Sequence, residues 1–182
     1  MGADAVSRAE PLPRTAGPVV LRRLSRDDLD AFQAYRTDPA VGRYQGWQPM
    51  SDADAIAFLD EMNVCPLLAA GAWTQLAIAE AGGGRLIGDV GLHLREDGSE
   101  VEIGFSLAAV AQGRGFGAAA VRAAIDLCFG LTPARRMVGI TDARNAASIR
   151  LLERIGMRLI ATQEALFRGE ACIERVYSID RP

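Results

Sequence analysis

The sequence predicts a single α/β domain, and three observations carry that prediction. Three strand-like segments follow one another between residues 73 and 107, with turn residues between them, which is typical of an antiparallel meander. From residue 115 onwards the apolar spacing changes to that of a helix. No repeat or linker divides the 182 residues, and this length suits one domain with a sizeable core.

The first residues differ in composition from the rest of the chain. Residues 1–17 are interrupted by acids, prolines and arginines and lack the apolar stretch of a signal peptide. We therefore expect a flexible tail over residues 1–17 and the single domain over residues 18–182. The run Val19-Val20-Leu21 is apolar and β-branched and follows a proline, which predicts an edge strand.

Two helices are expected before the meander. Ser25 and Ser51 are each followed three positions later by an aspartate, Asp28 and Asp54, and this spacing is typical of a helix start. Apolar residues at helical spacing follow both starts, and Asp38-Pro39 is expected to end the first helix.

The meander and a long helix come next. Strands are expected over residues 73–79, 85–94 and 101–107, because these segments are apolar, partly alternating and separated by glycine-containing turns. Residues 115–130 then present alanines and larger apolar residues at helical spacing, which predicts a long helix.

The last third of the chain adds one helix and three strands. Residues 137–141 read as a buried strand, and residues 146–155 as a helix with Gly156 at its C-terminal end. Late strands are expected over residues 157–161 and 172–179. The expected order is therefore β-α-α-β-β-β-α-β-α-β-β.

Composition excludes several classes of function. All 20 basic residues are arginine, which excludes a lysine Schiff base and a Walker-type phosphate loop. His93 is the only histidine, so the two-histidine site of zinc peptidases is excluded, and we expect no metal. The three cysteines lack CxxC spacing, and reduced thiols in a cytoplasmic protein are the simpler interpretation. The net charge of -3 gives no support to a nucleic-acid binder, and no segment has the apolar length of a membrane helix.

The most informative segment is Gln112-Gly113-Arg114-Gly115-Phe116-Gly117, which lies between a strand and the long helix. Its glycines let the backbone approach a ligand closely. The amides of Gly113 to Ala118 include unpaired donors at the helix start, and with the helix dipole they form an anion site suited to a pyrophosphate. Arg114 adds a charged fork. The alternative interpretation is a turn that merely tightens strand-to-helix packing.

A nucleotide-binding enzyme is another interpretation of the same loop. The dinucleotide fingerprint needs G-x-G-x-x-G and an acid after a second strand about 20 residues on. Here the third glycine is misplaced, and Asp126 lies inside the expected helix. The preceding meander is antiparallel and is not the start of a βαβ unit, so we rank this interpretation low.

Gln112-x-x-Gly115-x-Gly117 resembles the acetyl-CoA signature Q/R-x-x-G-x-G/A of the GNAT superfamily of N-acetyltransferases. Further segments resemble its RimJ/RimL-like branch, which acetylates ribosomal-protein N-termini: Arg43 to Pro49, Glu102 to Leu107, and Asn145 to Ser148 followed by Leu152 to Met157. These matches occur in order, and the resemblance extends from Val19 to Ile179.

The resemblance implies an acetyl-CoA-dependent N-acetyltransferase with a mixed, twisted sheet flanked by helices. The strands at 101–107 and 137–142 would run parallel and splay apart, with the pantetheine arm of acetyl-CoA in the wedge between them. The diphosphate would lie on the amides of the glycine loop, and Asn145 would hydrogen-bond the pantetheine. The cofactor residues that the resemblance implies are Phe105, Ser106, Leu107, Gln112, Gly113, Arg114, Gly115, Phe116, Gly117, Ala118, Asn145 and Ser148.

In the implied reaction an amine attacks a thioester, and a carboxylate is expected to accept the amine proton. Glu102, on the strand that leads to the glycine loop, is the best candidate. Its alternative interpretation is a surface carboxylate that pairs across the sheet. Weaker candidates for the base are Glu100, Asp89 and Asp142.

An acid for the departing thiolate is a separate question. Many members of the superfamily carry a tyrosine for this step at the position where this chain has Leu152. The RimL-like group is similar in lacking it, and a serine, here Ser148, is then proposed for the role. Ser148 as a helix-start residue that satisfies backbone amides is the alternative, and a thiolate can also leave without an acid.

The acceptor is expected to enter over the first two helices and the loop of residues 43–49. Tyr44 and Trp47 are candidates to stack on it or wall it, and a core role for Trp47 is the alternative. Peptide N-termini and small-molecule amines both stay open as acceptors, a homodimer is the expected assembly, and no nucleic-acid or membrane partner is expected. The alternative function is a non-catalytic domain that binds CoA or a partner.

Overall fold

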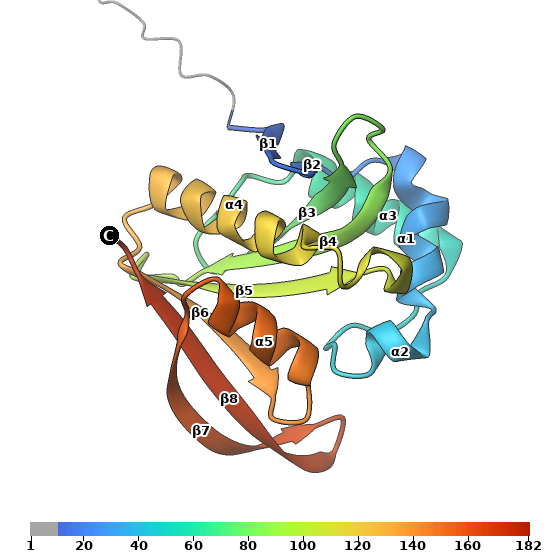
Figure 1. Ribbon diagram of the computed structural model, residues 1–182. Coiled ribbons are helices and arrows are strands. Elements are labelled where there is room, and N and C mark those ends of the chain that lie inside the picture. The colour runs from blue at the N-terminus through green and yellow to red at the C-terminus, as the bar shows by residue number, and fades with distance from the viewer. Residues whose placement is uncertain (1–10) are drawn as a thin grey trace, which may run out of the picture.

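The computed structural model describes residues 11–182, which form one eight-stranded sheet with helices on both faces (Figure 1). The order across the sheet is β1-β2-β3-β4-β5-β6-β8-β7. The strands are β1 (Arg14–Ala16), β2 (Val19–Arg23), β3 (Trp73–Glu80), β4 (Leu86–Leu94), β5 (Glu100–Leu107), β6 (Arg136–Asp142), β7 (Arg158–Phe167) and β8 (Glu170–Asp180). The helices are α1 (Leu29–Arg36), α2 (Pro39–Gly42), α3 (Asp52–Val64), α4 (Phe116–Leu131) and α5 (Ala146–Arg154).

The centre of the sheet contains its only parallel pair among the described strands. β5 and β6 run parallel, because the chain crosses between them through α4, and every other neighbouring pair is antiparallel. The parallel ladder ends at Glu102 opposite Val138, although β5 continues to Leu107 and β6 to Asp142. The two strands therefore splay apart beyond this point, which confirms the expected wedge.

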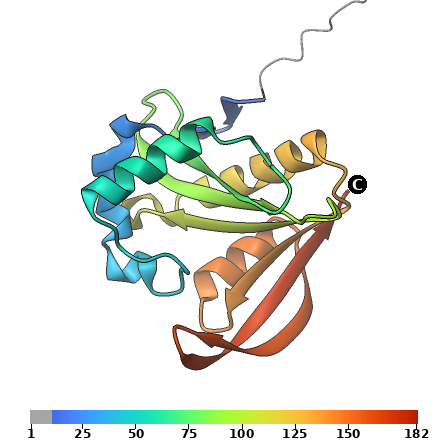
Figure 2. The same cartoon turned by 180° about the vertical axis from the view of Figure 1, so that it is seen from behind.

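The two faces of the sheet carry different helices. α4 and α5 cover one face (Figure 1), and their core includes Ile103 and Val121. α1 and α3 cover the other face over the strands near the N-terminus, and their core includes Phe32 and Leu59 (Figure 2). The half of this second face that β6, β8 and β7 form carries no helix (Figure 2).

The N-terminal expectations need two corrections. The sequence predicts a tail over residues 1–17; residues 1–10 lie outside the described part of the chain, and residues 14–16 form β1. β1 pairs antiparallel with β2, so Val19–Leu21 is not an edge strand. The expectation is wrong here because a three-residue, mostly polar strand shows no alternating apolar pattern.

The first helix ends before Asp38-Pro39, as expected, and a short helix that the sequence did not predict follows it. α1 ends at Arg36, and Asp38-Pro39 then begins the short helix α2. The Asp38 side chain accepts a hydrogen bond of 2.8 Å from the Ala40 backbone N–H, and the proline occupies the first turn, as both residue types favour. The remaining expected elements are present, and β7 and β8 are longer than expected. Within residues 11–182, no helix has the length and apolar character needed to cross a membrane.

Candidate functional site

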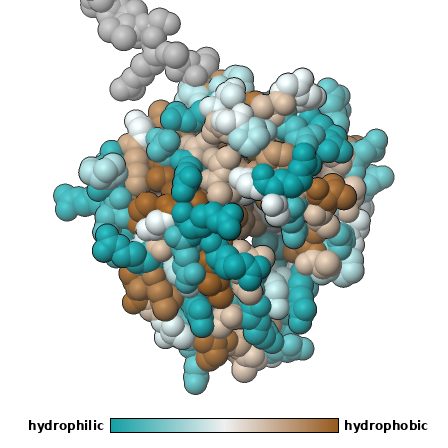
Figure 3. All heavy atoms as spheres, viewed as in Figure 1, coloured by the Kyte–Doolittle hydropathy of each residue, from teal (hydrophilic) through white to brown (hydrophobic). Residues whose placement is uncertain are grey.

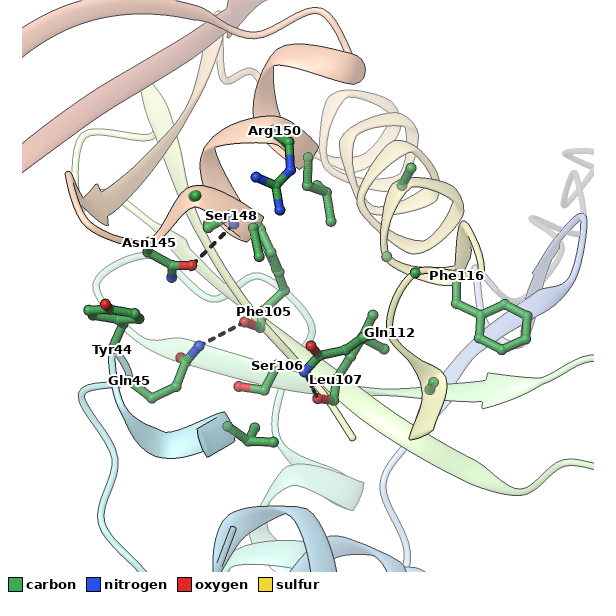
Figure 4. Close-up of a pocket in the computed structure, with 18 of the residues that line it drawn as sticks. Tyr44, Gln45, Phe105, Ser106, Leu107, Gln112, Phe116, Asn145, Ser148 and Arg150 are labelled. Carbon is green, nitrogen blue, oxygen red and sulfur yellow. Dashed lines mark hydrogen bonds between the residues drawn. The ribbon is translucent and has the colours of Figure 1, made fainter. Parts of the chain in front are cut away.

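A cavity of about 610 Å³ lies where β5 and β6 separate. Its walls come from the end of β5, the glycine loop and first turn of α4, the start of α5, and the α2 region (Figure 4). On the surface, a recess opens near the middle of this face, with hydrophilic side chains at its rim (Figure 3). The cavity brings together eleven of the twelve residues that the family resemblance implies for the cofactor: Phe105, Ser106, Leu107, Gln112, Gly113, Gly115, Phe116, Gly117, Ala118, Asn145 and Ser148.

The edge of β5 that faces the cavity presents backbone carbonyls with no partner strand. Gln45 donates its side-chain amide to the carbonyl of Phe105 at 3.1 Å, and Gln112 donates to the carbonyl of Leu107 at 3.0 Å (Figure 4). Both acceptors lie beyond the end of the β5–β6 ladder. Two glutamine side chains therefore occupy positions where an extended ligand with amide groups would pair with β5.

The glycine loop turns the chain into α4. Gly113 and Gly115 have φ values of +74° and +84°, a region that strongly favours glycine, and Gly115 is the residue before the first helical residue. The first backbone N–H groups of α4 have no partner within the helix. Since Gly115, Gly117 and Ala118 line the cavity, the positive end of the helix dipole faces it.

Gly117 has a packing role in addition to lining the cavity. A Cβ atom at this position would lie 2.6 Å from a methyl carbon of Leu151 and 3.1 Å from one of Leu107. The absence of a side chain thus lets α4 approach both α5 and β5 closely. Gly117 therefore tightens the packing, as one interpretation of the loop expects, and it also borders the cavity; the anion site itself stays a prediction.

The start of α5 closes the opposite wall of the cavity. The Asn145 side-chain oxygen accepts a hydrogen bond of 3.2 Å from the Ser148 backbone N–H, so Asn145 caps the helix (Figure 4). The amide nitrogen of Asn145 has no partner among residues 11–182 and is available to a ligand. The Ser148 hydroxyl likewise makes no hydrogen bond within the described residues, and it lines the cavity.

Several arginines supply positive charge to the cavity, but Arg114, the arginine that the sequence predicts at the anion site, is not among them. Arg43, Arg144, Arg150 and Arg154 line it, and the Arg150 side chain extends from α5 toward the cavity (Figure 4). Arg114 points elsewhere: its guanidinium lies 3.6 Å from the Glu80 carboxylate and 4.5 Å from the centre of the Phe116 ring. The structure thus does not bring Arg114 to the cavity.

Three of the four candidate carboxylates are engaged by arginine. Asp89 is buried and pairs with Arg36 at 2.7 Å, while also accepting hydrogen bonds from Tyr35 and Gln75. Asp142 pairs with Arg144 at 2.7 Å, which holds the pKa of Asp142 below its usual value. Glu100 pairs with Arg136 at 2.7 Å.

Glu102 has no ion pair among residues 11–182 and lies at the point where the β5–β6 ladder ends. Its neighbours on β5, Val101 and Ile103, pack into the core beneath α4, so Glu102 faces the opposite side of the sheet beside His93. Partial burial raises the pKa of the Glu102 carboxyl, and the charges of Glu100 and Glu174 raise it further, against a lowering effect of His93. Glu102 does not line the cavity and precedes Phe105, the first residue of β5 that does, by three positions.

The two expected acceptor residues lie in different surroundings. Tyr44 lines the cavity. Trp47 is half-buried: its ring lies 4.5 Å from the Arg36 guanidinium, and its indole N–H donates to the Ser106 hydroxyl at 3.2 Å. Trp47 therefore packs into the α1–α3 side of the protein, in agreement with the core interpretation.

Several cavity residues escaped the sequence analysis. The sequence did contain a signal that could have identified Arg43 and Gln45 as site residues, because both belong to the 43–49 segment that resembles the RimJ/RimL-like branch. Arg150 follows Ser148 by two positions, and only the placement of α5 against β5 shows that it faces the cavity. Among residues 11–182 no group of three or more histidine, cysteine, aspartate or glutamate side chains is arranged to hold a metal ion.

Comparison with known proteins agrees with this arrangement of elements. The family described as "Acetyltransferase (GNAT) domain" matches residues 19–158, which is most of the chain. This protein therefore belongs to the GNAT acetyltransferase family. The comparison with curated protein sequences finds no match.

Solved structures with the same fold are distant in sequence. A GNAT-family acetyltransferase from Bacillus anthracis has a TM-score of 0.80 at 20% identity, covering 91% of this chain and 96% of that one. A proposed ribosomal-protein-serine acetyltransferase from Vibrio cholerae has a TM-score of 0.76 at 20% identity, covering 92% and 96%. Spermidine N-acetyltransferase from Vibrio cholerae, solved with CoA and spermine, has a TM-score of 0.74 at 20% identity, covering 90% and 96%. The fold class expected from the sequence is thereby confirmed.

Proposed function

We propose that this acetyltransferase moves an acetyl group from acetyl-CoA to a primary amine. One observation carries the proposal: a single cavity combines the unpaired edge of β5, the N-terminal amides of α4 and a group of arginines. An extended chain of amides ending in a diphosphate matches these three features in that order.

Each feature of the cavity corresponds to one part of the donor. The carbonyls of Phe105 and Leu107, after release of the two glutamine side chains, are placed to accept hydrogen bonds from pantetheine amides. The first N–H groups of α4 would bind the diphosphate, and Arg150 and Arg154 would add charge for the phosphates. The free amide nitrogen of Asn145 would donate to a pantetheine carbonyl.

Glu102 is the proposed base. When the amine nitrogen bonds to the thioester carbon, the C–S bond breaks and the amine loses a proton, which Glu102 accepts directly or through water. The other three candidate carboxylates are held by arginines and are poorly suited to this task. The unpartnered hydroxyl of Ser148 is the group proposed to protonate the departing sulfur.

The acceptor is proposed to approach on the face of the sheet that bears Glu102. Gly104 lies on the same side of β5, and a Cβ atom there would meet nothing within 4 Å. Among residues 11–182 no helix covers the half of this face over β6 and β8, which favours an approach from this side (Figure 2). Peptide N-termini and polyamines are both primary amines that we propose as acceptors, and the neighbouring structures include a proposed ribosomal-protein-serine acetyltransferase and a spermidine N-acetyltransferase.

A non-catalytic CoA-binding domain is the second candidate, favoured by one observation. Leu152, at the position where many members of the family carry a tyrosine acid, is 1% exposed and packed in the core. A thiolate that leaves without an acid would make this difference harmless.

Release of the CoA thiol separates the two candidates. The protein is mixed with acetyl-CoA and a panel of amines that includes N-terminal peptides, polyamines and amino acids, and free thiol is followed with a colorimetric reagent. We expect release with at least one amine class, and loss of that release in Glu102→Gln. CoA binding without release for every amine would instead establish the non-catalytic domain, and absence of CoA binding would contradict both.

A further inference from the structure

The tip of the β7–β8 hairpin contacts the loop of residues 43–49 across the surface of the protein. At this tip the Arg168 guanidinium nitrogen Nη2 lies 3.2 Å from the carbonyl oxygen of Gly42, 3.0 Å from that of Gln45 and 3.1 Å from that of Trp47. Arg168 is separated from these residues by at least 121 positions in the sequence. One cationic group therefore binds the carbonyl of the last residue of α2 and two carbonyls of the 43–49 loop, which borders the cavity.

The same loop is held from its other side by contacts already described. Gln45 donates to the Phe105 carbonyl at 3.1 Å, and the Trp47 indole N–H donates to Ser106 at 3.2 Å. The Arg36 guanidinium stacks on the Trp47 ring at 4.5 Å. The loop is thus contacted by Arg168 on one side and by β5 on the other, and its Tyr44 lines the cavity.

The backbone at the hairpin tip points to a role for the Arg168 side chain. Arg168 and Gly169 form the two-residue turn between Phe167 and Glu170, with φ values of +53° and +82°. Turns of this kind prefer asparagine, aspartate or glycine at both central positions, because a side chain in the left-handed region costs about 1–2 kcal/mol. Arginine is not one of the residues preferred at this position. Its contacts with the 43–49 loop are a physical reason for its presence there.

We propose that Arg168 is a positioning residue that holds the 43–49 loop against β5 and thereby shapes the entrance for the amine acceptor. This inference rests on the proposed function in one respect, namely that the acceptor passes the loop. Arg168 touches neither the cavity nor Glu102, and it acts through Gln45 and Trp47.

Limited proteolysis tests the contact without any need for activity. Trypsin cleaves after arginine, and the Arg43–Tyr44 bond lies within the loop. We expect Arg168→Ala to speed cleavage at this bond by about tenfold, since hydrogen bonds to a charged group are lost. Arg168→Lys should give an intermediate rate. The matched control is Arg158→Ala, which removes an exposed arginine of the same hairpin that has no ion pair among residues 11–182.

The cleavage pattern decides between local and general loosening. Faster cleavage at the Arg43–Tyr44 bond, with cleavage after Arg175 unchanged, supports the proposal. An unchanged rate at Arg43, or an equal rise at Arg43 and Arg175, overturns it. Thermal melting of each variant shows whether the fold is intact before digestion.

Steady-state kinetics test the consequence for the acceptor. In the thiol-release assay Arg168→Ala is expected to raise KM for the amine about tenfold while KM for acetyl-CoA changes less, and Arg158→Ala should match the wild type. Equal KM values for wild type and Arg168→Ala would overturn the positioning role. Absence of thiol release in the wild type would contradict the proposed function alone, since the proteolysis result would still test the Arg168 contact.

Discussion

At the residue scale, arginine partners distinguish the carboxylates near the wedge from one another. Asp89, Asp142 and Glu100 each have a guanidinium nitrogen at 2.7 Å, which occupies an oxygen of each carboxylate. Glu102 has none, and burial together with neighbouring carboxylates raises its pKa. A carboxylate whose pKa is moved toward neutrality is better suited to accept a proton from an amine, which supports the proposal that Glu102 is the base.

The first prediction concerns this side chain. Glu102→Gln is expected to lower kcat by about 10²–10⁴, the usual contribution of a general base, with little change in KM for acetyl-CoA. The base must be ionised, so wild-type activity falls as the pH drops through the Glu102 pKa. Because that pKa is raised, the fall begins at a higher pH than for an ordinary glutamate, and the variant should lose this acidic limb. Glu96→Gln, at an exposed glutamate, is the control, and wild-type kcat in Glu102→Gln would exclude this base.

The second prediction compares two arginines of similar exposure and different orientation. Arg150 lines the cavity, whereas Arg114 contacts Glu80 and Phe116. Arg150→Ala is therefore expected to weaken CoA binding about tenfold, with a smaller effect at high salt, and Arg114→Ala should bind like the wild type. Calorimetric titration with CoA checks both. A larger loss for Arg114→Ala would show that the glycine-loop arginine reaches the ligand after all.

At the element scale, the candidate site lies where regular backbone hydrogen bonding stops. The β5–β6 ladder ends at Glu102, which leaves the carbonyls of Phe105 and Leu107 to side chains. α4 begins immediately after Gly115, which leaves its first amides unpaired. Both sets of groups open onto the cavity, so strand edge and helix start together define the ligand site.

The third prediction tests the helix start. Gly115→Val places a β-branched side chain at φ +84°, which costs about 1–2 kcal/mol and displaces the loop. We expect lower stability in urea and a loss of CoA affinity of at least about tenfold, in proportion to the loss of aligned amides. Gly130→Ala, in the last turn of α4 where a Cβ meets nothing within 4 Å, is the control and should bind CoA normally. Unchanged CoA affinity in Gly115→Val would contradict the loop assignment.

At the scale of the whole molecule, the order of elements was predictable because strand and helix periodicities are local properties of the sequence. β1 was missed because three mostly polar residues carry no such pattern. The glycine loop and Asn145 were predictable because each belongs to a short motif with a known geometry. Both line the same cavity, and their role in binding the cofactor stays a prediction.

Contacts between distant segments were not predictable from the sequence. The position of Arg168 against the 43–49 loop depends on how the last hairpin curves back over the sheet. Whether Arg114 or Arg150 faces the cavity likewise depends on how α4 and α5 are rotated on the sheet. Such features follow from packing and require the three-dimensional structure.

The most direct test of the central claim is a crystal structure of the protein grown with CoA. We expect the pantetheine along β5 between Phe105 and Leu107, the diphosphate within hydrogen-bond distance of the first amides of α4, and the Gln45 and Gln112 side chains released from their carbonyls. Electron density for CoA at another place on the protein, or a wedge that stays empty at saturating CoA, would contradict the claim.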